Sequence, residues 1–358
     1  MSISIVPMTE EHVPLVRAFN KRLVDGGGEI ALQFPESPIL DWLPNLGDGG
    51  KMFQMPYVAI DEGVVRGGFI LKRQEFWRAG KTISACHYRL PLSEGTVNKA
   101  YVSMGMQMLR HALRLEPKLF ALGMGNSKRP LPRMLKLMNW SLVETPFWFR
   151  VNHPMRFLRE IRALRSSTAR LICAEFAAMF GLGWIGINSI QAARTRSPLR
   201  PIAEAVSALG DWTSEVWERY CTEYSFAALR DSKTLNILYP SNSNRFLYYR
   251  IGSGWAVLLD TPMRGHKQFG DLRVGTIVDA MGDPREIVSA ATAILNDRGV
   301  DLVISNQLAE CWSAAFSDCG YFSGPSNYIF AVSKDLSSGI DFSSAHINRG
   351  DGDGPIHL

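Results

Sequence analysis

The chain carries the same succession of elements twice, and this duplication constrains its fold more than any other feature. In each copy, a short apolar strand leads to an asparagine, an amphipathic helix, a small or polar residue before an aromatic one, and a further strand. The first copy spans 119–151 around Asn126, and the second spans 300–332 around Asn306. The aromatic steps are Asn139-Trp140 and Gly320-Tyr321. Two such units predict a duplicated α/β domain.

At 358 residues the chain is long enough for two domains, each with its own hydrophobic core. Its hydrophobic content of 46% and charged content of 20% are typical of a globular protein. We predict an N-terminal domain over 1–155, a basic and apolar helical connector over 156–205, and a C-terminal domain over 206–335. The segment 336–358 is rich in Ser, Gly and Asp and lacks apolar periodicity, so we predict a disordered tail.

Charge and cysteine usage favour a protein of a reducing compartment. The net charge is +5, and much of the excess lies between Arg150 and Arg200. Such a stretch attracts phosphates, anionic lipid or nucleic acid without distinguishing among them. The five cysteines are odd in number and lack CxxC spacing, which argues against a disulfide framework or a structural zinc site. The N-terminus has no features of a secretory signal, so we expect a cytoplasmic protein.

Within the connector, residues 171–190 are mostly apolar and have arginines on both sides. One interpretation is an amphipathic helix lying on an anionic membrane surface, which would bring the protein to the inner face of the membrane. The other, which we favour, is a connector buried between the two domains. A membrane-spanning helix is disfavoured, because Glu175 and the glycines Gly181, Gly183 and Gly186 interrupt the segment.

Predicted strands and a long helix precede each copy of the repeat. The first half contains a hairpin from Tyr57 to Leu71, a strand from Ile83 to Leu92 and a helix from about Val102 to Arg114. In the second half a helix is predicted from Asp283 to about Asn296, because proline and acids suit its first turn. The strands predicted before it are Leu235–Tyr239, Phe246–Ile251, Trp255–Asp260 and Leu272–Asp279.

This order of elements resembles the GNAT superfamily, the GCN5-related acyl-CoA N-acyltransferases. The resemblance rests on the asparagine after the strand and on the aromatic step in both halves, so the chain is similar to a tandem GNAT protein. It implies an α/β fold of two GNAT-like domains, each a mixed, mostly antiparallel sheet flanked by helices. It also implies acetyl-CoA or another acyl-CoA as co-substrate.

In this family, a loop of the pattern Arg/Gln-x-x-Gly-x-Gly/Ala opens the helix after the fourth strand, and its free amides hold the pyrophosphate of CoA. The corresponding stretch, 100–105, keeps the final small residue, has serine for the first glycine and lacks the leading basic side chain. The second half has 281–286 there, where two acids and a proline disfavour a phosphate. We therefore expect CoA in the N-terminal domain. The implied cofactor-binding residues are Arg89, Ser103, Met104, Gly105 and Asn126.

Acyl transfer to an amine needs a base for the amine proton and an acid for the departing thiolate. Glu94, at the end of the fourth predicted strand, is the predicted base, through a water molecule if needed, and His87 is the alternative. Tyr101 is the predicted acid. Each residue also has a structural interpretation, since Glu94 can cap a turn or pair with Lys99, and His87 and Tyr101 can simply be packed.

Two residues of the second half, Asp279 and Asn306, are candidate substrate ligands. Asp279 ends a predicted strand and can orient an acceptor, although an aspartate there also fixes turns. Asn306 repeats the position of Asn126, for which a helix-capping role is the alternative.

The chain shows no metal-ligand spacing, no Gly-x-Ser-x-Gly elbow and no Gly-x-x-x-x-Gly-Lys-Ser/Thr loop. The resemblance implies a transferase that moves an acyl group, by our prediction acetyl, from acyl-CoA to the amine of a small molecule or amino sugar, without a metal. One alternative is a catalytically inactive GNAT-like binding or scaffold protein. Another is an enzyme like the aminoacyl-tRNA-dependent peptidyltransferases, with tRNA on the basic connector. Because the arginine-rich coiled insertion of that group is not evident, we expect neither tRNA nor DNA as a partner.

Overall fold

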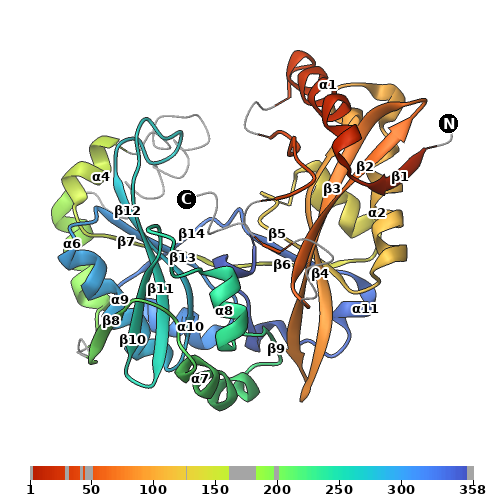
Figure 1. Cartoon of the computed structure of the whole chain (residues 1–358). Coiled ribbons are helices and arrows are strands. Elements are labelled where there is room, and N and C mark those ends of the chain that lie inside the picture. Colours follow the sequence, from red (N-terminus) through yellow and green to blue (C-terminus); the bar gives the residue numbers. More distant parts are fainter. Residues whose placement is uncertain are drawn as a thin grey trace. The chain divides into compact units, whose positions relative to one another are not determined.

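The computed structural model describes residues 3–28, 32–40, 43–44, 51–125, 127–160, 183–196 and 201–352 (Figure 1). The chain divides into two compact units. The first comprises Met1–Val143 and Ile329–Ile340, and the second comprises Glu144–Tyr328 and Asp341–Leu358.

The first unit is built on a mixed sheet with the strand order β1-β2-β3-β4-β5-β15-β6. Neighbouring strands from β1 to β4 are antiparallel, β4 and β5 are parallel, and β15 is antiparallel to β5. The bounds are β1 (Ser4–Pro7), β2 (Phe53–Asp61), β3 (Val64–Arg78), β4 (Lys81–Ser93), β5 (Leu119–Leu122), β15 (Ile329–Val332) and β6 (Ser141–Glu144). The helices are α1 (Val13–Asp25), α2 (Met104–Leu115), α3 (Pro130–Leu137) and α11 (Lys334–Ser337), with short 3-10 helices η1 (Glu10–His12), η2 (Glu94–Thr96) and η3 (Lys99–Tyr101).

Helices cover both faces of this sheet because its strands are apolar on both faces. Successive residues of a strand point to opposite sides. Phe69 and Leu71 of β3 pack against the buried side of α2, whereas Ile70 between them packs against Phe19 of α1. The apolar residues of α2 recur at helical spacing and lie in the first of these two clusters. The α2 face and the α1 face of the sheet are therefore distinct.

The second unit repeats the design with the strand order β14-β7-β13-β12-β11-β10-β8. Its β12 and β13 are parallel, and the other neighbouring strands are antiparallel. The bounds are β14 (Phe322–Gly324), β7 (Phe147–Val151), β13 (Leu302–Asn306), β12 (Arg273–Met281), β11 (Gly254–Pro262), β10 (Leu247–Ile251) and β8 (Ala203–Val206). The helices are α4 (Pro154–Glu160), α6 (Gly183–Arg194), α7 (Trp212–Tyr220), α8 (Ser232–Leu238), α9 (Pro284–Asp297) and α10 (Glu310–Asp318). Shorter elements are β9 (Phe226–Ala228), β16 (Ala345–His346) and the 3-10 helices η5 (Cys221–Glu223), η6 (Phe342–Ser344) and η7 (Arg349–Asp351).

One strand of each sheet comes from the other half of the sequence. Strand β7 follows β6 along the chain but lies between β13 and β14 in the second sheet. Strand β15 follows β14 along the chain but lies between β5 and β6 in the first sheet. The predicted class, two mixed α/β sheets flanked by helices, is confirmed. The repeat predicts two contiguous halves, 1–155 and 206–335, whereas both units are discontinuous in sequence.

Two predictions about the second half are wrong. Of the strand predicted over Leu235–Tyr239, the residues up to Leu238 belong to a helix, α8, because Asp231 caps it by accepting a hydrogen bond from the Thr234 amide at 2.8 Å. The tail predicted as disordered over 336–358 is ordered as far as 352, and 353–358 lie outside the described residues. Its order comes from buried polar contacts of Asn348 and Asp351, which a hydropathy pattern does not reveal.

The predicted connector, 156–205, is described only at its two ends, in α4 and α6 and from 201 onward. Most of the segment 171–190 lies outside the described residues, so the predicted membrane contact stays a prediction. Within the part of the chain that the structure describes, every helix is too short or too polar to cross a bilayer.

Candidate active site

In the first unit the parallel strands β4 and β5 diverge soon after they meet. They pair at Cys86↔Leu119 and His87↔Phe120, although β4 continues to Ser93. Beyond this point the Leu122 amide donates to Nε2 of the His87 side chain at 3.3 Å. In a continuous parallel ladder this amide would donate to a backbone carbonyl of the neighbouring strand. Here it donates to a side chain instead. We call this place the β4/β5 divergence.

A bulge in β4 lies beside the divergence. The register between β3 and β4 shifts between Gly68 and Ile70, and Leu90 adopts a left-handed φ of 46°. Glycines on β3 allow the close approach that this bulge requires. A Cβ on Gly67 would lie 2.9 Å from the Leu92 carbonyl oxygen, and one on Gly68 would lie 2.8 Å from the Phe34 ring. A bulge aims backbone groups out of the regular ladder, which suits a site that must bind a polar atom there.

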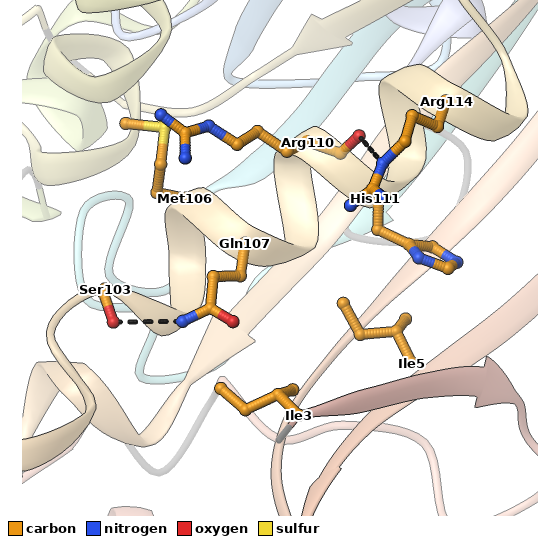
Figure 2. A pocket seen from close by; sticks show the side chains of 8 residues that line it. All are labelled: Ile3, Ile5, Ser103, Met106, Gln107, Arg110, His111 and Arg114. Carbon is orange, nitrogen blue, oxygen red and sulfur yellow. Dashed lines mark hydrogen bonds between the residues drawn. The ribbon is translucent and has the colours of Figure 1, made fainter. Parts of the chain in front are cut away.

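The start of α2 is open to an anion. Ser103 precedes the helix, but its side chain makes no capping hydrogen bond to the first amides. Its Oγ instead accepts from Gln107 Nε2 at 3.2 Å (Figure 2). Ser103 is exposed, and Met104 is fully buried, so Met104 can offer only its backbone. Amides and the helix dipole converge at such a terminus and favour a phosphate.

The structure brings Ser103, Met104 and Gly105 together at this terminus but places Arg89 elsewhere. Arg89 lies opposite Ile70 in the β3–β4 register, and Ile70 points to the α1 face of the sheet. Arg89 is therefore on the face that α2 does not cover. The remaining predicted cofactor ligand, Asn126, lies outside the described residues.

Glu94 and Tyr101, the predicted base and acid, are brought together through an arginine. The Glu94 carboxylate is buried and accepts from Arg66 Nη1 at 2.9 and 3.2 Å and from Arg22 Nε at 3.1 Å. The Arg66 guanidinium also lies 4.5 Å from the centroid of the Tyr101 ring. Both oxygens of Glu94 are thus engaged in ion pairs, whereas the sequence suggested Lys99 as its partner. The arginine partners were missed because they are far from Glu94 along the chain.

His87, the alternative base, lies at the divergence itself. Its ring is buried and stacks on Phe120, with centroids 4.9 Å apart and planes 9° from parallel. This stacking fixes the ring, and the acceptor role toward Leu122 requires Nε2 to be the unprotonated nitrogen. The structure does not bring His87 into the group formed by Glu94, Arg66 and Tyr101.

In the second unit, both predicted substrate ligands are fully buried. Asp279 accepts from Tyr239 Oη at 2.8 Å, from Asn348 Nδ2 at 2.7 Å and from Arg230 Nε at 3.1 Å to one of its oxygens and 2.9 Å to the other. Asn306 accepts from Arg349 Nε at 2.9 Å. Both residues therefore bind other residues of the protein here. These partners were not predicted from the sequence, because two of the four, Asn348 and Arg349, belong to the segment predicted as a disordered tail.

A surface hollow of about 620 Å³ lies beside α2, next to β1 (Figure 2). Two arginines, Arg110 and Arg114, are exposed on its helical wall. Burial, followed by the charge of Arg114, lowers the pKa of His111. The hollow is lined by Ile3, Ile5, Ser103, Met106, Gln107, Arg110, His111 and Arg114. Among the predicted site residues that the structure describes, only Ser103 borders the hollow. The three-to-four-residue spacing of the lining residues along α2 is the signal that could have indicated it.

No group of three or more metal-ligating side chains occurs within the described ranges. No protein-family model matches the chain, and no curated protein matches it in sequence. Solved structures do match. A Saccharomyces cerevisiae N-myristoyltransferase with bound myristoyl-CoA and inhibitors is 9% identical with a TM-score of 0.56, over 96% of this chain and 85% of that one. A GCN5-related N-acetyltransferase from Anabaena variabilis is 9% identical with a TM-score of 0.53, over 92% of this chain and 72% of that one. The chain has the duplicated GNAT fold that its sequence resembles.

Proposed function

We propose that the protein is an acyl-CoA-dependent N-acyltransferase whose working site is the β4/β5 divergence of the first unit. The observation that carries the proposal is the occurrence, in one unit, of diverging parallel strands and an uncapped helix start. An extended acyl-pantetheine arm can use the backbone groups that the strands leave unpaired, while the helix amides receive the phosphates. The structurally similar N-myristoyltransferase, which holds myristoyl-CoA, supports this assignment.

In this proposal the amides of Ser103, Met104 and Gly105 bind the pyrophosphate, because the side chain of Ser103 does not compete for them. Arg89 lies on the opposite face of the sheet. It would therefore contact the acceptor side of the thioester rather than the phosphates. We propose a small-molecule amine, such as an amino sugar, as the acceptor, and acetyl-CoA as the acyl donor.

The chemistry requires the amine nitrogen to attack the thioester carbonyl, the carbon–sulfur bond to break and the amine to lose a proton. Backbone groups turned outward by the bulge at Leu90 would donate to the developing oxyanion. His87 is the better placed of the predicted bases, since it lies at the β4/β5 divergence and its Nε2 accepts from the Leu122 amide there. If a pantetheine carbonyl accepted the hydrogen bond from the Leu122 amide in place of His87, Nε2 of His87 would be free to take the proton of the amine. Glu94 would then position Arg66 rather than act as the base.

Changing Ser103 to Glu tests the phosphate site. The substitution adds a negative charge to the first turn of α2, which the helix tolerates but a pyrophosphate does not. We expect acetyl-CoA to bind about tenfold more weakly, measured by isothermal titration of the full chain. Ser4→Glu adds the same charge at an exposed position on β1 and should leave the affinity within twofold. Equal affinity of Ser103→Glu and wild-type protein would contradict the proposed site.

Both predicted bases, Glu94 and His87, already accept hydrogen bonds from other groups of the protein. This favours a second candidate function, an acyl-CoA-binding protein without turnover. Glu94 is occupied by two guanidinium groups and His87 by an amide. Release of free CoA from acetyl-CoA in the presence of a panel of amines separates the two functions. The transferase requires release that falls by about two orders of magnitude in His87→Gln with binding retained. Binding without release for every amine would favour the second function.

A further inference from the structure

The second unit contains the counterpart of the β4/β5 divergence. Its parallel strands β12 and β13 pair from Val274↔Leu302 to Thr276↔Ile304, and β12 then continues to Met281. A register shift between Val257 and Leu258 places a bulge in β12 directly after the last pair. The two units thus share a parallel pair that stops early and a bulge beside the point where it stops. We call this second place the β12/β13 divergence.

The C-terminal segment 345–351 contacts the β13 side of this divergence. The Leu308 amide, just after β13, donates to the Ile347 carbonyl oxygen at 3.0 Å. Gln307 and Asn348 form an antiparallel bridge. Arg349 Nε donates to Asn306 Oδ1 at 2.9 Å. The end of β13 is therefore paired with the segment instead of with β12.

The same segment contacts the β12 side. Asn348 Nδ2 donates to Asp279 Oδ1 at 2.7 Å. Gly350 approaches so closely that a Cβ on it would lie 2.8 Å from Asp279 Oδ2 and would clash with the Tyr239 hydroxyl. Only glycine fits this approach without displacing its neighbours. Residues 347–350 therefore bridge the strand ends that diverge.

A buried arginine holds the segment in place. Arg230, fully buried, donates from Nη2 to Asp351 at 2.7 Å and pairs with Asp279 at 2.9 Å. The second Asp351 oxygen accepts from the Asn348 amide at 2.9 Å. One guanidinium thus joins a carboxylate of β12 to a carboxylate of the segment. Breaking a buried pair of this kind is costly, because it leaves a charge without a partner.

We propose that the segment 345–351 is a permanent internal occupant of the β12/β13 divergence, so that the second unit cannot bind an acyl thioester and the chain binds one acyl-CoA. The part of this inference that concerns CoA rests on the proposed function. The backbone groups at the end of β13 that an extended arm would use are already hydrogen-bonded to the segment. The helix start next to them is also occupied, since Asp283 Oδ1 accepts from the Arg285 amide at 2.9 Å and the Glu286 amide at 3.0 Å.

Two measurements on the full chain test the inference. Hydrogen exchange followed by mass spectrometry should show amides of 346–350 protected at least a hundredfold over the rate of an unstructured peptide. Equilibrium dialysis with acetyl-CoA should show one bound molecule per chain. Exchange of 346–350 at the unstructured rate, or two bound molecules, would overturn the inference. No bound acetyl-CoA with a protected segment would overturn the proposed function and leave the occupancy established.

A matched pair of variants addresses the cause of the protection. Gly350→Val places a side chain against Asp279 and Tyr239, and we expect protection of 346–350 to fall at least tenfold. Ser338→Val, at an exposed position in a turn of the same C-terminal region, should change it less than twofold. If Gly350→Val fails to fold, Asn348→Ala, which removes one hydrogen bond to Asp279, should still lower the protection measurably. Unchanged protection in Asn348→Ala and Gly350→Val would contradict the proposed contacts.

Discussion

The helices α2 and α9 occupy equivalent places in the two units, but their first turns differ. Each helix follows the fourth strand of its sheet and precedes the fifth. At α2, the preceding Ser103 leaves the first amides without a side-chain cap. At α9, Asp283 caps two amides at once. The same position is therefore available to an anion in one unit and filled by a carboxylate of the protein in the other.

The two strand divergences show the same difference between the units as the two helix starts. The β4/β5 divergence is held at its edge by one side chain, His87, whereas the β12/β13 divergence is bridged by 347–350. In the second unit, internal contacts thus occupy both places that correspond to the proposed acyl-CoA site of the first unit. A duplicated fold retains its frame because the frame is set by apolar packing, while the ligand contacts depend on a few polar residues that can change separately.

The comparison is tested most strongly by the arginines that hold the two polar clusters. Arg230→Met leaves Asp279 and Asp351 buried without a partner cation, and we expect the second unit to lose about 3–5 kcal/mol of its free energy of unfolding. Arg66→Met removes one of two arginines from Glu94, so the first unit should lose only about 1 kcal/mol. Urea denaturation of both variants measures the difference.

Arg219→Met, at an exposed position on α7, serves as the control and should shift stability by less than about 0.5 kcal/mol. Equal destabilisation by Arg230→Met and Arg66→Met would contradict the expectation that the buried cluster of Arg230, Asp279 and Asp351 contributes more to stability than the pairing of Arg66 with Glu94.

A smaller effect should appear as a pH dependence confined to the second unit. Burial, followed by the charge of Arg230, lowers the pKa of His346 to about 3. Besides Arg230 and Asp279, the ring faces Tyr224 and Trp312. The unfolded chain takes up a proton near pH 6.5 and the folded chain does not. The free energy of unfolding is therefore at its full value above pH 6.5. It falls by roughly 1 kcal/mol per pH unit as the pH falls toward 3.

Hydrogen exchange of 346–350 as a function of pH, corrected for the intrinsic rate, measures this linkage. His346→Gln carries no titrating group and should flatten the profile below pH 6.5. Residues 16–23 of α1, in the first unit, provide the internal reference. A profile for His346→Gln as steep as that of the wild type would assign the pH dependence to other groups.

The sequence predicted the fold where the signals are local. The composition of Asp61-Glu62-Gly63 between two predicted strands indicated the hairpin of β2 and β3, and the repeat indicated a second sheet of the same kind. It did not predict the exchange of β7 and β15. A strand has the same period-two pattern whichever sheet it joins, so the pattern does not distinguish contiguous halves from halves that exchange a strand. Leu235–Leu238 was misassigned because a short apolar run suits a buried strand or a helix equally well.

The candidate site was predictable only in part, because its polar partners come from distant positions. The helix predicted from about Val102 follows from local pattern, and α2 begins at Met104. The role of Ser103, Met104 and Gly105 as cofactor ligands stays a prediction. The hydrogen-bond partners of Glu94 and Asp279 cannot be predicted from a local sequence pattern. Arg66 precedes Glu94 by 28 positions, and Asn348 follows Asp279 by 69. Only the three-dimensional register brings such residues together, and a polar tail gives no hydrophobic signal that it is buried.

The smallest expected effect concerns the residue at each helix start. A Cβ on Gly105 would lie 3.6 Å from Met134 Sδ, which is ordinary contact, and an alanine suits a helix better than glycine. Gly105→Ala should therefore stabilise the first unit by about 0.5–1 kcal/mol. Asp283→Ala removes the cap of α9 and should destabilise the second unit by about 1 kcal/mol. Thermal unfolding measures both changes.

Acetyl-CoA titration of the same two variants then separates stability from binding. Gly105→Ala crowds the backbone that should approach the phosphates, so affinity should fall by about two- to threefold although the protein is more stable. Asp283→Ala frees the α9 amides but leaves 345–351 in place, so the number of bound molecules should stay at one. A second bound molecule in Asp283→Ala would mean that the helix cap, rather than the C-terminal segment, is what closes the second unit.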